Sequence, residues 1–404
     1  MRRARQLLTL HGPSGPRCGS ASNKPGMIPD GALLIRNGVI EEVGTSRRIE
    51  NLAIARTAKE IDAGGRIVLP AFVDADAVLV YPQPSGRQHL DEEPSETRIG
   101  LLSKHRLGYA ANAAAAEWVR AGAVSLGAHT AYADSLRDTI RILRIHQTLQ
   151  GKPLRIRSIF SPRATPGDAQ SADLLFTSLM GKWLSALRSR KLVSITEFIV
   201  ASPGEPNGGL PVEKIRLAAI FAAETGFAIR LRANGENDSA GLALACAGGS
   251  VAFLAPPWEP DAALRVMGTM GCVHVIPVTA ALRTRRWGAG AVRNEIDSGI
   301  PIALGSGYQP GGLTSMNPQY LLHLGVEQFG MTPAEAICAT TYNGACSLRM
   351  SHVTGSLEPG KSADLTMLDV PDYRDLVYRT GHNDVCLTMR NGQTVYARSG
   401  LKHD

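Results

Sequence analysis

The sequence predicts an α/β protein: a (β/α)8 barrel of the TIM type, together with a small β domain formed by both ends of the chain. Three observations carry this prediction. Strand-like apolar runs alternate with helical runs about eight times after residue 67, which favours a parallel closed barrel over an open sheet. Both ends of the chain show short strand patterns instead. The 404 residues, with 42 Gly and 24 Pro, suit two or three domains of ~100–200 residues built from many short elements.

The two ends of the chain are expected to form one composite β domain, residues 1–66 and 352–404. Short apolar runs occupy residues 7–10, 32–36 and 39–43, and later residues 365–369, 385–389 and 394–397. Asn37-Gly38 and Asn391-Gly392 stand between paired runs, and both residues of Asn-Gly can take the positive φ of a hairpin turn.

Residues 67–351 are expected to form the barrel. Strand-like runs lie at residues 68–73, 123–128, 154–159, 193–200, 228–231, 251–254, 273–278 and 301–304. Helical patterns lie at residues 108–121, 135–149, 172–189, 212–225, 238–247, 261–270 and 286–298, with a helical pair ending at residue 348. Periodicity alone does not establish that the eighth strand closes onto the first.

Composition and charge exclude several classes of protein. The 43 Lys and Arg exceed the 36 Asp and Glu, but the excess is spread out and no basic stripe is interleaved with aromatic residues, so we expect no nucleic-acid partner. No run reaches the ~18 apolar residues of a membrane span, and the first residues do not resemble a signal peptide. The six cysteines are scattered without CxxC spacing. We therefore expect a cytoplasmic protein with reduced thiols. A homo-oligomer is compatible with the sequence.

Motifs at both ends of the predicted barrel resemble the amidohydrolase superfamily. They are residues 61–65 (IDAGG), 69–74 (LPAFVD) and 355–365 (GSLEPGKSADL). Residues 131–132, 304–311, 331–336 and 378–383 resemble, more narrowly, the imidazolonepropionase family, which hydrolyses the C–N bond of a cyclic amide. The resemblance implies that the terminal domain is a β-sandwich. It also implies a zinc or iron site at the barrel mouth.

The metal ligands that the resemblance implies are absent at the matching positions. The His-X-His pair of the first strand reads Asp76 and Val78, and the later ligand positions hold Arg232, Phe253 and Gly307. Valine, phenylalanine and glycine side chains offer no lone pairs, and a guanidinium does not deprotonate to become a ligand. We therefore expect no metal cofactor, with Asp76 as the remaining carboxylate.

Arg232 suggests a physical replacement for the metal. A fixed positive charge at this position would pair with Asp76, or with Asp74, because a buried charge is costly without a partner. The alternative is that Arg232 reaches the rim of the barrel and pairs with Glu236 or Asp238, since charged groups are seldom fully buried.

Four positions match the substrate shell implied by the resemblance: Arg87, Tyr132, Arg163 and Arg232. Converging guanidinium groups would suit a small anionic ligand, because they bind carboxylate or phosphate in a bidentate way. The alternative is that these arginines are ordinary charged residues of exposed loops. The acid that the resemblance places late in the fourth strand reads Val200.

Two histidines lie on predicted barrel strands, His129 and His274. Together with Asp76 they could form a relocated metal triad, although a lone strand histidine is more often a hydrogen-bonded core residue.

Three functions follow from these patterns. The first is a pseudoenzyme of the imidazolonepropionase type that has lost metal-dependent hydrolysis and binds a small anion. The second is an active hydrolase of C–N bonds other than peptide bonds, with a relocated metal or none; Asp76 would then be its general base. The third is a scaffold subunit that pairs with an active paralogue.

Overall fold

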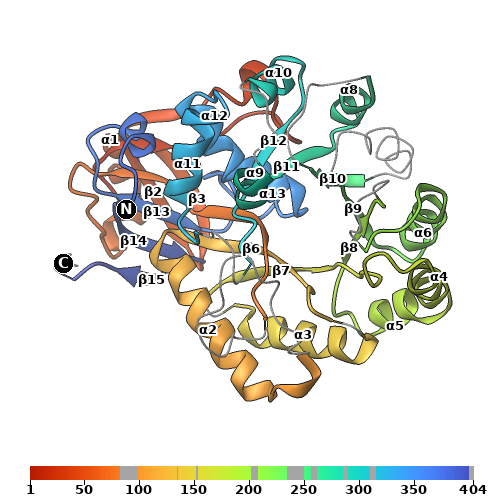
Figure 1. Cartoon of the computed structure of the whole chain (residues 1–404). Helices are drawn as coiled ribbons and strands as arrows, with labels where there is room; N and C mark the ends of the chain where they lie inside the picture. Colours follow the sequence, from red (N-terminus) through yellow and green to blue (C-terminus); the bar gives the residue numbers. More distant parts are fainter. Residues whose placement is uncertain are drawn as a thin grey trace.

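The computed structural model describes residues 1–81, 99–133, 135–151, 153–201, 208–233, 250–255, 262–284, 290–309 and 315–399. Within these ranges the chain forms two sheets, one built from its two ends and one in the middle of the chain (Figure 1). Both parts of the predicted fold class are therefore confirmed. No helix in the described ranges is long and apolar enough to cross a membrane.

The terminal sheet has seven strands in the order β15-β14-β13-β4-β1-β2-β3. β1 and β4 are parallel, and the other neighbours are antiparallel. The strands are β1 (Ala4–Leu8), β2 (Met27–Arg36), β3 (Val39–Thr45), β4 (Ile67–Pro70), β13 (Leu365–Leu368), β14 (Val385–Arg390) and β15 (Gln393–Ala397). β4 lies in this sheet, so the sheet extends past residue 66, and the strand expected at residues 68–73 is split between the two sheets.

Both Asn-Gly pairs form the expected hairpin turns. Asn37 and Gly38 join β2 to β3 with φ of 54° and 82°. Asn391 and Gly392 join β14 to β15 with φ of 48° and 70°. Positive φ at both central residues matches the twist of the flanking strands, which explains why the hairpins form at these sites.

The central sheet contains eight parallel strands in chain order. They are β5 (Phe72–Ala77), β6 (Ala123–His129), β7 (Arg155–Phe160), β8 (Ile195–Ile199), β9 (Ala228–Arg232), β10 (Ser250–Leu254), β11 (Val273–Pro277) and β12 (Ile302–Gly305). A parallel bridge from Ala77 to Tyr308 joins the end of β12 to β5. The backbone bonds Gly307 N to Asp76 O (2.8 Å) and Val78 N to Tyr308 O (2.9 Å) support this closure.

Helices surround the barrel strands (Figure 1). They are α2 (Lys104–Arg120), α3 (Leu136–Leu149), α4 (Ala169–Ser178), α5 (Leu184–Ser189), α6 (Val212–Glu224), α8 (Ala262–Thr269), α9 (Val278–Thr284), α10 (Ala291–Asp297), α11 (Pro318–Glu327), α12 (Pro333–Ala339) and α13 (Tyr342–Ser347), with α1 (Ser46–Glu50) beside the terminal sheet. A π-helical segment (Leu179–Trp183) joins α4 to α5, and short 3-10 segments lie at Gly19–Ala21, Ala53–Thr57, Ile99–Leu101 and Tyr373–Val377. The helix expected at residues 238–247 lies outside the described residues.

An apolar layer fills the lower part of the barrel. Val73, Ile159, Ile195 and Ala228 form one buried cluster there, with Leu348 packed against them. Because successive side chains of a strand alternate between faces, residues two positions later on β8 and β9 also face the interior. Glu197 and Arg230 therefore lie above this apolar layer, and they begin a polar layer that continues to the mouth.

Candidate functional site

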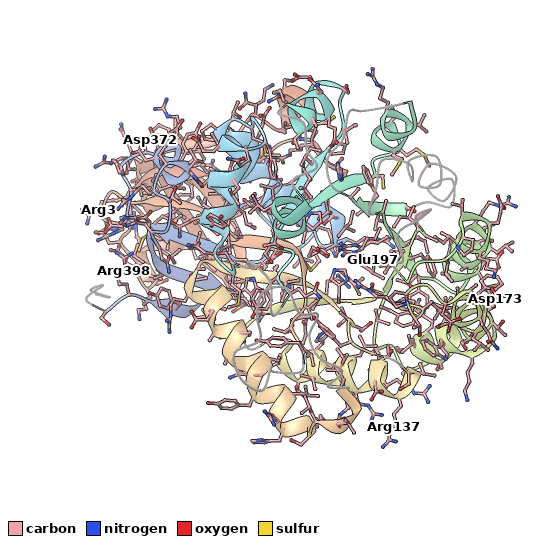
Figure 2. The ribbon with its side chains drawn as sticks, viewed as in Figure 1. Arg3, Arg137, Asp173, Glu197, Asp372 and Arg398 are labelled. Atoms are coloured by element: carbon pink, nitrogen blue, oxygen red, sulfur yellow. The ribbon has the colours of Figure 1, made fainter. Side chains whose placement is uncertain are left out.

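Five ionisable side chains meet at the carboxyl ends of neighbouring barrel strands. Asp76 comes from β5, His129 from β6, Glu197 from β8, and Arg230 and Arg232 from β9. Figure 2 shows Glu197 in the middle of the barrel, far from the labelled charged residues at the periphery. The carboxyl ends of the strands are where this architecture places binding and catalytic groups.

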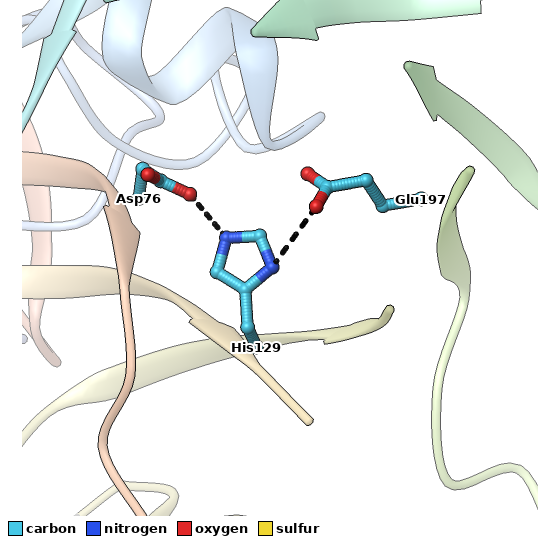
Figure 3. Close-up of side chains that lie close together, drawn as sticks. All are labelled: Asp76, His129 and Glu197. Carbon is cyan, nitrogen blue, oxygen red and sulfur yellow. Dashed lines mark hydrogen bonds and ion pairs between the residues drawn. The ribbon is translucent and has the colours of Figure 1, made fainter. Parts of the chain in front are cut away.

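The His129 ring lies between the two carboxylates (Figure 3). Its Nε2 is in close contact with Asp76 Oδ1, and its Nδ1 is 3.5 Å from Glu197 Oε1. The Ser161 hydroxyl donates to the same Glu197 oxygen at 3.0 Å. All three side chains of this group are buried.

Arg232 bridges the same two carboxylates. Its Nε donates to Glu197 Oε1 at 2.9 Å, and its Nη2 donates to Asp76 Oδ1 at 2.7 Å. Only 16% of the Arg232 side chain is exposed, so solvent screens these ion pairs weakly. The pairing of Arg232 with Asp76 that the sequence suggests is thus present in the structure.

Arg230 lies beneath Arg232 and is fully buried. Its Nη1 donates to the Ala75 carbonyl at 3.0 Å. Its Nε is 3.5 Å from Glu197 Oε2, and its Nη2 is 3.7 Å from Asp76 Oδ1. Two guanidinium groups therefore balance two carboxylates inside the barrel.

This network keeps both acids ionised. Burial alone would raise the pKa of Asp76, but Arg232, His129 and Arg230 together hold it far below its ordinary value. Burial opposes ionisation of Glu197 as well, yet Arg232, His129 and Arg230 lower its pKa to about 2. The carboxylates in turn raise the pKa of Arg232 in spite of its desolvation, so the guanidinium stays charged.

The donor atoms of a possible metal site are present, contrary to the expectation that Asp76 alone remains. One ligand atom each from Asp76, His129 and Glu197 lie within 4.8 Å of one another. Arg232, however, donates to one oxygen of each acid, Asp76 Oδ1 and Glu197 Oε1. A divalent cation beside two guanidinium groups also meets strong repulsion. The guanidinium of Arg232 therefore competes with a metal for these two acids, although His129 and the second oxygen of each acid remain as possible ligands.

A small cavity of about 50 Å³ opens above the network. Among the described residues, Asp76, His129, Arg163, Arg232, Tyr308 and Gln309 are in its lining. Arg163 and Arg232 thus line one cavity at the barrel mouth, and Arg163 is exposed there. Tyr132 adopts a positive φ of 66° and accepts a hydrogen bond from Gln309 Nε2 at 2.9 Å, at the edge of this cavity. Arg87 lies outside the described residues.

Asp74, the second acid expected as a partner of Arg232, does not join the site. Asp74 turns away from the network and accepts hydrogen bonds from Trp118 Nε1 (2.9 Å) and the Ser306 amide (2.9 Å). Glu236 and Asp238, the alternative partners of Arg232, lie outside the described residues.

The triad of His129, His274 and Asp76 is wrong, because His274 is bound elsewhere. Its Nδ1 is 2.6 Å from Glu295 Oε2 and its Nε2 is 3.1 Å from the Ala255 carbonyl. The ring also stacks on Phe253 at 4.3 Å between centroids. Glu197 takes the third position instead.

Glu197 and Arg230 are the site residues that the sequence analysis missed. Both lie within short apolar runs that predict ordinary buried strands, and the resemblance places the acid at Val200 instead. Each is a lone charged residue among apolar neighbours, and this pattern could have identified them. Glu197 lies two residues after Ile195 and Arg230 two residues before Arg232, so each faces the same side of its strand as that residue. A charge on the inner face of a buried strand needs a partner, and each of these two side chains lies close to the other.

Known proteins share the whole architecture of this chain. The model of the amidohydrolase family matches residues 267–395. An imidazolonepropionase from Solibacter usitatus is 31% identical over 98% of both chains, and one from Brevibacillus brevis is 28% identical over 99% of this chain and 98% of its own.

Solved structures agree on the fold. Ochratoxinase from A. niger superimposes with a TM-score of 0.73 at 17% identity, covering 98% of this chain and 95% of the other. Atrazine chlorohydrolase from Arthrobacter aurescens, complexed with zinc, gives a TM-score of 0.71 at 15% identity, with 98% and 94% covered. Together with the full-length match to curated relatives, these findings show that the chain belongs to the amidohydrolase family, as an imidazolonepropionase-like member.

Proposed function

We propose that this chain has lost metal-dependent hydrolysis and binds a small anionic molecule at the barrel mouth. The observation that carries the proposal is the double contact of Arg232 with Asp76 and Glu197, which places a permanent cation among the atoms that could hold a metal. A guanidinium supplies positive charge without an open coordination position, so it cannot activate water as a bound metal does.

The charges around the cavity favour an anion. Arg163, Arg230 and Arg232 oppose Asp76 and Glu197, which leaves one net positive charge among these described groups when His129 is neutral. Nη1 of Arg232 has no hydrogen-bond partner in the described part of the chain, and Arg163 has no ion pair there. Both guanidinium groups can therefore donate to a carboxylate in the cavity.

The names of the curated relatives suggest the class of ligand. They are imidazolonepropionases, so a five-membered nitrogen ring that carries a propionate is a reasonable first ligand. We expect its carboxylate to contact Arg163 and Arg232. The cavity of about 50 Å³ has room for the carboxylate alone, so the ring would lie on its open side, next to Tyr308 and Gln309.

Calorimetric titration with imidazole propionate tests the proposal. Binding is expected for the carboxylate and not for the matching neutral amide. Arg163→Gln should weaken binding about tenfold, the effect of one lost charged hydrogen bond of ~1.5 kcal/mol. Arg137→Gln, an exposed arginine on α3, is the matched control. Equal binding of the acid and the amide would refute the anionic ligand.

The cluster of Asp76, His129 and Glu197 favours a second function, a hydrolase that binds its metal after Arg232 moves aside. Metal analysis after dialysis separates the two proposals. Stoichiometric zinc or iron, together with turnover of imidazolonepropionate that a chelator abolishes, would support the hydrolase. Protein without bound metal and without turnover supports the lead proposal.

A further inference from the structure

A second cavity lies at the end of the barrel opposite the mouth. Its volume is about 510 Å³, within the ~300–1,000 Å³ typical of small-molecule sites. The amino end of β7 and residues 192–194, just before β8, form its inner wall, and the last turns of α3 and α5 form its sides. Its polar lining includes Gln150, Arg157, Arg188, Lys191 and Ser194.

The lining is basic without compensating acids. Arg157, Arg188 and Lys191 all line the cavity, and its described lining contains no carboxylate. None of the three takes part in an ion pair within the described ranges. Arg155 provides the contrast, because it lies two residues before Arg157 on the same strand and pairs with Asp364 at 2.8 Å.

Arg157 is the least solvated of these cations. Its side chain is half-buried, and its Nη1 donates to the Ser194 hydroxyl at 3.3 Å. Burial lowers the pKa of Arg157, and the like charges of Arg349 and Arg155 lower it further. The opposite charge of a bound anion would offset both the cost of burying Arg157 and the repulsion between these cations.

The neutral groups of the lining are also arranged as donors. The Gln150 side-chain oxygen accepts from the Ile156 amide at 2.6 Å, which directs its NH₂ group outward as a donor. Ser194 accepts from Arg157 and so keeps its own proton to donate. The cavity thus offers cations and N–H or O–H donors, which is the chemistry that phosphate oxygens require.

We propose that this cavity binds a small phosphate-bearing molecule with more than one negative charge. Three cations in one cavity exceed what a single carboxylate needs, and the volume admits a group larger than phosphate itself. The site is separate from the barrel mouth, so this proposal does not depend on the function proposed there.

Titration of the full chain with pyrophosphate and with adenosine triphosphate tests the proposal. Saturable binding is expected, and sodium chloride of equal ionic strength serves as the control for screening. The double variant Arg188→Ser, Lys191→Ser changes two exposed side chains and should weaken binding about a hundredfold, roughly tenfold for each lost charged contact. The matched control is Arg190→Ser, which removes an exposed arginine between them that is not in the described lining.

The outcomes are distinct. Tighter binding of the nucleotide than of pyrophosphate would assign an organic phosphate, and equal binding would assign the phosphate group alone; both support the site. The carbonyl groups at the ends of α3 and α5 also favour nearby cations. If these carbonyl groups alone balance the charges of Arg157, Arg188 and Lys191, neither pyrophosphate nor adenosine triphosphate binds saturably. That result, or equal weakening by Arg190→Ser, would overturn the proposal.

Discussion

Replacing Arg232 by methionine tests the central ion-pair network. The substitution keeps most of the side-chain length but leaves Asp76 and Glu197 without the guanidinium that contacts both. Removing one partner from a buried ion pair costs about 3–5 kcal/mol. At about 2.1 cal/mol/K of unfolding entropy per residue, a chain of this length should lose roughly 4–6 °C in Tm. Arg163→Met, at an exposed position in the same cavity, should change stability by less than about 0.5 kcal/mol.

The same variant tests whether Arg232 excludes a metal. Once the guanidinium is gone, zinc can reach Asp76, His129 and Glu197, and zinc at about a hundred times its Kd should restore about 2.7 kcal/mol. Differential scanning calorimetry of the wild type and of both variants, with and without zinc, measures each effect. A wild-type chain that zinc stabilises as strongly as the Arg232→Met variant contradicts the reasoning, as does an unchanged Tm in that variant.

Three further predictions concern stability. The pKa of Glu197 is about 2 in the folded chain and near 4.5 in the unfolded chain, so its contribution to the free energy of unfolding is complete above pH 4.5 and is lost as the pH falls toward 2. In Glu197→Gln, the plot of the urea midpoint against pH should therefore be flatter in this range. Burial lowers the pKa of His146 to about 3, so stability should decline below pH 6.5 by at most about 1.4 kcal/mol per pH unit, and His146→Leu should remove that slope. Gly305→Ala would place a Cβ 2.6 Å from Asp76 Cβ, and it should lower the free energy of unfolding by about 1–3 kcal/mol, measured by thermal melting. A Tm equal to that of the wild type would show that β5 shifts without cost.

The fold could be predicted because its signals are local and repeated. Alternating strand and helix patterns indicated the barrel, and the two Asn-Gly turns located the hairpins of the terminal sheet. The division of residues 68–73 between two sheets could not be predicted, because β4 and β5 are separated by Ala71 alone and both are buried. A continuous apolar run does not reveal which sheet each half joins.

The site was predicted in part. Asp76 and Arg232 were found because they interrupt motifs with a known pattern, and their opposite charges indicated a pair. Glu197 and Arg230 do not interrupt such a motif. Their role depends on which face of the strand they occupy and on contacts between β5, β8 and β9, which cannot be derived from the sequence. His274 illustrates the reverse error, because its partner Glu295 comes from α10 and satisfies it away from the mouth.

The terminal sheet has a consequence for how the chain is made. Gln6, on β1, donates a hydrogen bond to Asp372, 366 residues later, and β4 pairs with β13 across the whole barrel sequence. A nascent chain on the ribosome therefore carries an unpaired strand edge throughout translation of the barrel, and such edges recruit other chains. A product that stops short of β13 leaves that edge open permanently, which makes the last forty or so residues a safeguard against self-association during synthesis.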